Sequence, residues 1–156
     1  MKRMQPLVLD SQLTPETDDT LHQLAWAIES GQGQFEPIFA RCDSLSRRDR
    51  LIQHLHQITS VPLQEIVLPP NSDHPYSIMS QQLVIDPPQA LMILGLDRLQ
   101  QPLIVLESLN QMREMFRQRF PCPVIFWLNG TLQKQLIRHA QDFESWGIAL
   151  DLDPST

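Results

Sequence analysis

The chain has 156 residues, of which 42% are hydrophobic and 19% are charged, and its formal net charge is −6. This length suits one domain with a sizeable core, and the acidic balance disfavours the phosphate contacts on which nucleic-acid binding depends. No apolar run approaches the roughly 18 residues of a membrane span, and the start MKRMQPLVLD lacks a signal-peptide core. We therefore expect a cytoplasmic protein that binds neither nucleic acid nor a membrane.

The cysteine content gives no sign of a metal centre or a disulfide framework. Cys42 and Cys122 are far apart in the chain, and neither belongs to a CxxC pair or to a Cys/His cluster with zinc spacing. His54 and His56 are two positions apart on an expected helix, so they point to different faces and cannot share a metal. We expect two free, buried thiols, no metal and no cofactor.

The predicted elements alternate between helix and strand. We divide the chain into an irregular N-terminal segment (1–13), a single α/β domain (14–153) and a short tail (154–156). Thr14, Pro15 and Glu16 form a helix start, with a capping hydroxyl, a proline at the first helical position and an acid near the positive end of the dipole. Further helices are expected to begin at Ser46, near Tyr76, at Pro102 (ending near Arg119) and at Thr131, and strands at 35–40, 64–68, 90–94, 124–128 and 147–152.

This order of elements predicts the fold class. The run ALMIL (90–94) is apolar without alternation, which is typical of a parallel strand buried on both faces. Alternating strands and helices indicate an α/β three-layer sandwich, in which helices cover both faces of a five-stranded, mostly parallel sheet. Ligands of such folds bind beyond the carboxyl ends of the strands, and any small-molecule chemistry is expected at that rim.

The segment ARCDSLSRRDRLI (40–52) follows the first strand, where a phosphate-binding loop would stand. Such a loop needs glycines so that backbone N–H groups converge on the phosphates, and also a lysine and a Ser or Thr. This segment contains neither glycine nor lysine. Arg47 and Arg48 stand near a helix start and could meet an anion, although solvated side chains are the simpler interpretation. Cys42 is either a packed thiol or, beside a helix N-terminus, a reactive one.

The third strand leads into LMILGLDRL (91–99), an apolar run followed by an acid. It resembles the Walker B motif of NACHT-type signal-transduction ATPases, in which Asp-Gly-Leu-Asp-Glu follows the apolar run and the acids serve magnesium and water. Matched on Gly-Leu-Asp, the magnesium aspartate falls on Leu94 and the last glutamate on Arg98. Only Asp97 remains of the acidic set, and the arginine would oppose a cation.

Three longer segments extend this resemblance: FEPIFARCDSLSRRDRLI, PQALMILGLDRL and PVIFWLNGTLQKQLIRHAQDFESW. Together they resemble a cyanobacterial family of degenerate P-loop domains, which is similar to the nucleotide-binding modules of signal-transduction ATPases and often precedes tetratricopeptide repeats. The resemblance covers about residues 21–152. It implies an ATPase-like fold with a central first strand, and it implies no defined activity.

The missing motifs and the resemblance favour a P-loop-like module that is not an enzyme and that acts in protein–protein interaction or regulation. One alternative is a nucleotide-binding signalling ATPase with an atypical phosphate loop. Another is a different small-molecule or redox binder on the same rim. In the favoured interpretation the nucleotide site survives as a vestigial rim made of Arg41, Asp43, Arg47, Arg48, Asp97, Arg98 and Asn129.

The partner of such a module would be another protein or a second copy of the chain. Binding hot spots favour Trp, Tyr and Arg, which makes Phe143, Trp146, Arg47 and Arg48 the interface candidates. In the alternative interpretation, Phe143 and Trp146 fix the last helix to the sheet. Core packing is the default expectation for Trp26, Trp127 and Trp146, and Trp146, which follows a polar run, is the best candidate for partial exposure.

Overall fold

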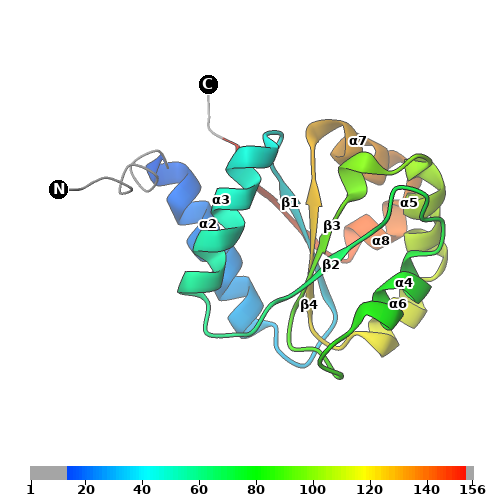
Figure 1. Cartoon of the computed structure of the whole chain (residues 1–156), viewed down its shortest axis with the longest axis horizontal. Coiled ribbons are helices and arrows are strands. Elements are labelled where there is room, and N and C mark those ends of the chain that lie inside the picture. Colours follow the sequence, from blue (N-terminus) through cyan, green and yellow to red (C-terminus); the bar gives the residue numbers. More distant parts are fainter. Residues whose placement is uncertain (1–13, 154–156) are drawn as a thin grey trace.

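The computed structural model of the chain describes residues 14–153 (Figure 1). The predicted irregular segment 1–13 and the tail 154–156 lie outside the described residues. The elements, in chain order, are α2 (Pro15–Ser30), β1 (Glu36–Arg41), α3 (Leu45–Ile58), β2 (Gln64–Val67), α4 (Pro75–Gln82), β3 (Leu91–Leu94), the 3-10 helix η1 (Leu96–Arg98), α5 (Pro102–Gln111), α6 (Arg113–Arg119), β4 (Pro123–Leu128), α7 (Gly130–His139), α8 (Gln141–Ser145) and β5 (Ile148–Asp151).

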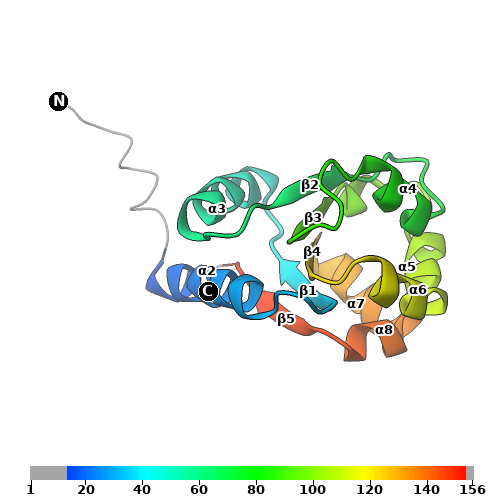
Figure 2. The ribbon, with the colours of Figure 1, turned by 90° about the horizontal axis from the view of Figure 1, so that it is seen from below.

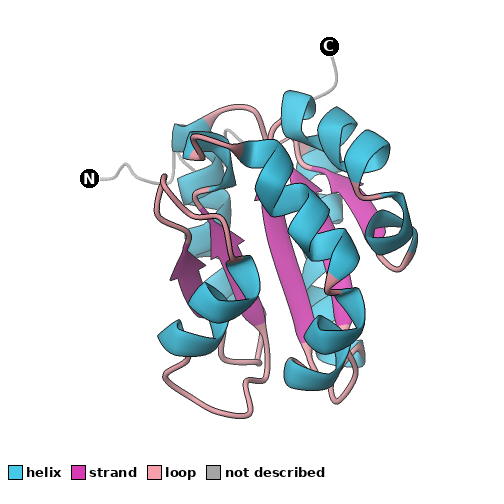
Figure 3. Cartoon of the chain, turned by 90° about the vertical axis from the view of Figure 1, so that its right-hand side faces the viewer, coloured by secondary structure: helices cyan, strands magenta, loops and turns pink. Residues whose placement is uncertain are grey.

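The strands form one sheet in the order β2-β3-β4-β1-β5, and every neighbouring pair is parallel. Helices α2 and α3 cover one face, and α4 to α8 lie on the other (Figures 1 and 2). The strands run side by side between these helical layers in a third view (Figure 3). The predicted α/β class and three-layer arrangement are therefore confirmed, and the sheet is parallel throughout.

A separate apolar core fills each side of the sheet. On the α2/α3 side, Leu24 and Leu55 pack against Ile38, Met92 and other side chains of the strands. On the opposite side, a group of aromatic rings that includes Phe116, Phe126 and Phe143 forms tilted and edge-to-face contacts. The expectation for β3 holds, since all four of its residues are buried.

The first strand lies next to the middle of the sheet. β1 pairs with β4 on one side and with β5 on the other, and β4 is the middle strand. Because parallel strands share one direction, their carboxyl ends form a single rim, toward which the β4 arrow points in Figure 1. The first residues of α3, η1 and α7 stand on this rim.

Three predicted helix boundaries are wrong. Ser44, not Ser46, caps α3, since its Oγ accepts the backbone N–H of Arg47 at 3.3 Å. Asn129, not Thr131, caps α7, because its Oδ1 accepts the N–H of Leu132 at 2.8 Å. In both cases two capping residues stand two positions apart, and the earlier one is used.

The third error concerns the long helix that was expected from Pro102 to Arg119. It is two helices, α5 and α6, because the chain turns at Met112, whose ψ of 17° departs from helical geometry. In α6, Phe116 is buried while Met115 is exposed.

The two edges of the sheet differ. Beside β2, the side chain of Gln64 bonds to the backbone of Val84 and Ile85, and the side chain of Gln82 donates to the Val67 carbonyl. Beside β5, no described residue forms a hydrogen bond on the outer side of the strand. The segment 82–85 thus lies against the β2 edge, whereas the β5 edge has no hydrogen-bond partner among residues 14–153.

Within residues 14–153, no helix is both long enough and apolar enough to cross a membrane.

Candidate functional site

The connection between β1 and α3 consists of only Cys42, Asp43 and Ser44. A phosphate-binding loop must be long and rich in glycine, so that several N–H groups can surround the phosphates. Three residues that carry side chains cannot form such a ring. The rim therefore has a short turn between β1 and α3, with no glycine-rich loop.

The carboxylate of Asp43 is bound at the start of α7. Asp43 Oδ1 accepts the backbone N–H of Gly130, the first residue of α7, at 2.7 Å, and Oδ2 accepts from Arg41 Nη2 at 3.1 Å. A helix N-terminus favours negative charge. Here the Asp43 carboxylate supplies that negative charge at the start of α7. The Gly130 hydrogen bond, followed by the Arg41 contact, holds the pKa of Asp43 below its usual value.

Arg41 joins the ends of β1 and β5. Its Nε lies 3.3 Å from Asp153 Oδ2, and its Nη1 lies 3.9 Å from Asp151 Oδ2. Asp153 Oδ1 also accepts the backbone N–H of Asp43 at 2.9 Å. The hydrogen bond and charge of Asp43 are the main reasons why the pKa of Arg41 is raised. One cation is thus shared by three acids, and its charge is engaged inside the molecule.

A second ion pair crosses the rim between α3 and η1. Arg48 Nη1 lies 3.5 Å from Asp97 Oδ1, and both side chains are only 15% exposed. Asp97 is the acid that follows the apolar run of β3, and the Arg48 guanidinium lies against it. The expectation that Arg48 is solvated is wrong, because this ion pair and its contact with Asp49 hold it against the surface.

The remaining predicted rim residues have separate roles. Arg47 is also not free in solvent, since its Nε donates to the Leu152 carbonyl at 3.2 Å and its Nη2 donates to Thr17 Oγ1 at 3.2 Å. Asn129 is occupied as the cap of α7. Arg98 is exposed on η1. The structure therefore brings Arg41, Asp43, Arg48, Asp97 and Asn129 together, while Arg47 ties α3 to α2 and to the end of β5.

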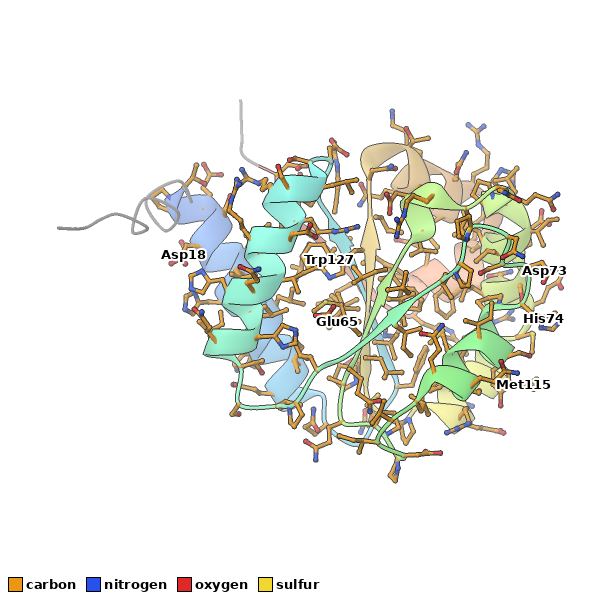
Figure 4. The ribbon with its side chains drawn as sticks, in the orientation of Figure 1. Asp18, Glu65, Asp73, His74, Met115 and Trp127 are labelled. Carbon is orange, nitrogen blue, oxygen red and sulfur yellow. The ribbon has the colours of Figure 1, made fainter. Side chains whose placement is uncertain are left out.

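A cavity of about 210 Å³ opens between these elements, and its lining includes Asp43, Arg48, Asp97 and Trp127. The side chain of Trp127 lies between α3 and the sheet (Figure 4). The charged groups of the cavity are two carboxylates and one guanidinium, a balance that opposes a polyphosphate. The cavity volume is below the roughly 300–1,000 Å³ of pockets for drug-sized ligands, and a broader depression of about 520 Å³ that shares Asp43 and Asn129 adjoins it.

Cys42 is a packed thiol. It is buried, and its Sγ lies 3.5 Å from the Ser44 carbonyl. Burial, together with the negative charge of Asp153, raises its pKa to about 11. Burial alone raises the pKa of Cys122 to about 12. Nucleophilic chemistry needs the thiolate, so this geometry does not activate either cysteine.

The tryptophans and Phe143 occupy three environments. Phe143 is fully buried and contacts Phe39 and Phe126, so it offers no surface to a partner and ties α8 to the sheet. Trp127 is buried as expected. Trp146 is half-buried, as its polar neighbours indicated. The core expectation for Trp26 is wrong, because this residue lies on the outer side of α2 and is 69% exposed.

The vestigial rim named from the sequence leaves out two groups of the Asp43 network, the Gly130 N–H and the Asp153 carboxylate. The acid-rich end of the last strand, Asp151-Leu152-Asp153, was a usable signal, since it reaches the same rim as Arg41. A backbone donor has no sequence signal of its own.

In the part of the chain that the structure describes, no group of three or more His, Cys, Asp or Glu side chains is arranged to hold a metal ion. A scan against models of protein families finds no match. A search of curated proteins finds no relative either.

Proposed function

We propose that this chain is a degenerate P-loop domain that has lost nucleotide binding and serves as a non-catalytic module for protein–protein interaction or regulation. The observation that carries the proposal is the position of the Asp43 carboxylate. It sits on the first N–H of α7 and against Arg41, at the end of a connection of three residues. A bound phosphate would have to displace this tethered carboxylate.

The Arg48–Asp97 ion pair supports the same proposal. Magnesium catalysis in P-loop proteins needs an acid that is free to hold the metal. Here that acid faces a guanidinium, and removing the guanidinium would leave a mostly buried carboxylate without its partner. We further propose a cytoplasmic location, which the two unpaired cysteines support, because free thiols persist in reducing compartments.

A thermal-shift experiment with Mg-ATP, Mg-GTP and Mg-ADP tests this function. A ligand that binds only the folded state at about 100 times its Kd adds about 2.7 kcal/mol to the free energy of unfolding. At ~5 mM nucleotide, a site with a Kd of about 50 µM would therefore raise Tm by several degrees. We expect no shift and no heat of binding in calorimetry.

A clear shift would contradict the proposal. If Asp97→Asn and Arg48→Ala also removed that shift, the result would favour the alternative function, a nucleotide-binding signalling ATPase with an atypical phosphate loop. Asp73→Asn, on the exposed connection before α4, is the matched control for a change of one charge.

A further inference from the structure

A groove between α5 and α7 carries positive charge on an otherwise acidic chain. Leu103 of α5 lines it together with Thr131, Lys134, Gln135, Arg138 and His139 of α7, and its volume is about 270 Å³. We refer to it below as the α5/α7 groove. It is separate from the small cavity under Arg48, and Lys134 also lines the broader depression in front of Arg41 and Gly130.

The two cations of the groove lack acidic partners. Most arginines of residues 14–153 pair with a carboxylate, as Arg41, Arg48, Arg113, Arg117 and Arg119 do. Neither Lys134 nor Arg138 forms an ion pair with any described residue, and Glu107, one turn after Leu103 on α5, does not pair with them. Both cations are exposed.

The spacing of Lys134 and Arg138 indicates which charge pattern a ligand of the groove would carry. Lys134 and Arg138 are four positions apart on one helix, which places them on the same side of α7 about 6 Å apart along its axis. Two like charges in this arrangement repel each other, and a partner with two carboxylates at matching distance would relieve that repulsion. Leu103, 38% exposed, adds an apolar contact on the wall formed by α5.

We propose that the α5/α7 groove docks an acidic protein segment, in which two carboxylates about one helical turn apart meet Lys134 and Arg138 and an apolar side chain between them meets Leu103. This inference rests on the interaction role proposed above and names its partner chemistry. Charge complementarity supplies the selectivity, because the chain has a net charge of −6 and the two cations of the groove have no acidic partner among the described residues.

Fluorescence anisotropy with the full chain tests the proposal. The probe is a labelled synthetic helical peptide with two glutamates four positions apart and a leucine between them. A second peptide carries glutamines in place of the glutamates, and a third carries lysines. We expect the glutamate peptide to bind at least about tenfold more tightly than the glutamine peptide at ~50 mM salt, and this advantage to shrink at ~300 mM salt.

Charge reversal supplies the decisive comparison. The double variant Lys134→Glu/Arg138→Glu is expected to lose its affinity for the glutamate peptide and to bind the lysine peptide instead. Arg50→Glu/Arg98→Glu changes the net charge equally at two cations outside the groove, and it should retain most of the affinity for the glutamate peptide. Thermal melts of both variants confirm that they are folded.

Three results would overturn the inference. One is equal binding of the glutamate and glutamine peptides, or no binding of either. Another is an equal loss of affinity in the two double variants, which would indicate an effect of net charge alone. The third is tighter binding of a single-stranded oligonucleotide or of anionic vesicles than of the glutamate peptide. Since no Mg-ATP, Mg-GTP or Mg-ADP is used, each result is distinguishable from failure of the thermal-shift experiment.

Discussion

Arg48 of α3 and Asp97 of η1 form an ion pair across the rim of the sheet, with Nη1 and Oδ1 3.5 Å apart and both side chains 15% exposed. We expect Arg48→Ala to lower the free energy of unfolding by about 1–3 kcal/mol, because it leaves the Asp97 carboxylate largely buried without its cation. Urea denaturation measures this change. Asp49→Asn removes the other, more exposed carboxylate near Arg48 and should cost less than about 0.5 kcal/mol. If the two substitutions lower the free energy of unfolding equally, the Arg48–Asp97 pair contributes no more to stability than an exposed ion pair.

The carboxylate of Asp43 gives the stability of the domain a component that depends on pH. Its pKa in the folded chain is lowered, first by the Gly130 N–H and then by Arg41. The charged form therefore stabilises the fold above the unfolded pKa of about 3.9, and this contribution is lost as the pH falls through the lower folded pKa.

Asp43→Asn keeps the shape and removes the charge. Because Asp43 is more than half exposed, we expect a cost of only about 1 kcal/mol near neutral pH. The difference between the wild type and this variant should shrink as the pH falls below about 4. Urea denaturation at several pH values measures the difference, with Asp73→Asn as the control. A difference that stays constant with pH would contradict the assigned role of the charge.

Gly95, between β3 and η1, has a left-handed backbone conformation and also lies too close to another segment for a side chain. Gly33 shares only the first property and so serves as a comparison. The φ of Gly95 is +93°, and a Cβ there would lie 2.5 Å from the Leu68 carbonyl oxygen. Gly33 has a similar φ of +88°, but a Cβ at that position would meet nothing within 4 Å. We expect Gly95→Ala to cost about 2–4 kcal/mol and Gly33→Ala about 1 kcal/mol, since only the first adds a clash with the backbone. If thermal melts show that Gly95→Ala and Gly33→Ala destabilise the protein equally, the backbone at Leu68 can move away from the added Cβ without a cost in free energy.

The three tryptophans should give three different costs on replacement by alanine. Trp127 is buried, and its loss should cost about 3–5 kcal/mol. Trp146 is half-buried under the guanidinium groups of Arg113 and Arg117, at 5.8 and 5.7 Å from its ring centroid, and about 2 kcal/mol is expected. Trp26→Ala should change the free energy of unfolding by less than about 0.5 kcal/mol. Urea denaturation ranks the three variants, and a Trp146→Ala protein as stable as the wild type would leave that indole free to act as an interface anchor.

Apolar patterning was enough to predict the layers of the fold. The unbroken run before Gly95 predicted a buried strand, and Thr14 with Pro15 predicted the start of α2, because these signals are local. Helix starts were less certain where two caps compete, as Ser44 and Ser46 do. The turn at Met112 has neither glycine nor proline to announce it, and packing of Phe116 against Tyr76 and Phe120 accompanies it.

The contacts of the rim could not be predicted in the same way. The Asp43 carboxylate and the Gly130 N–H are 87 positions apart, and the pairing of Arg48 with Asp97 joins two different crossovers. Sequence spacing indicates that these groups reach one rim. It does not indicate which acid meets which base, since that depends on the twist of the sheet and on side-chain rotamers.

The unequal edges of the sheet limit how the molecule can assemble. Within residues 14–153, the segment 82–85 is tied to the β2 edge by the side chains of Gln64 and Gln82, while the backbone of β5 has no hydrogen bond on its outer side. A strand added beside β5 from a second copy, related by a two-fold axis, would use the open edge of both copies at once. Growth by strand pairing would then stop at two molecules, so a fibre would first require the segment that covers β2 to come away.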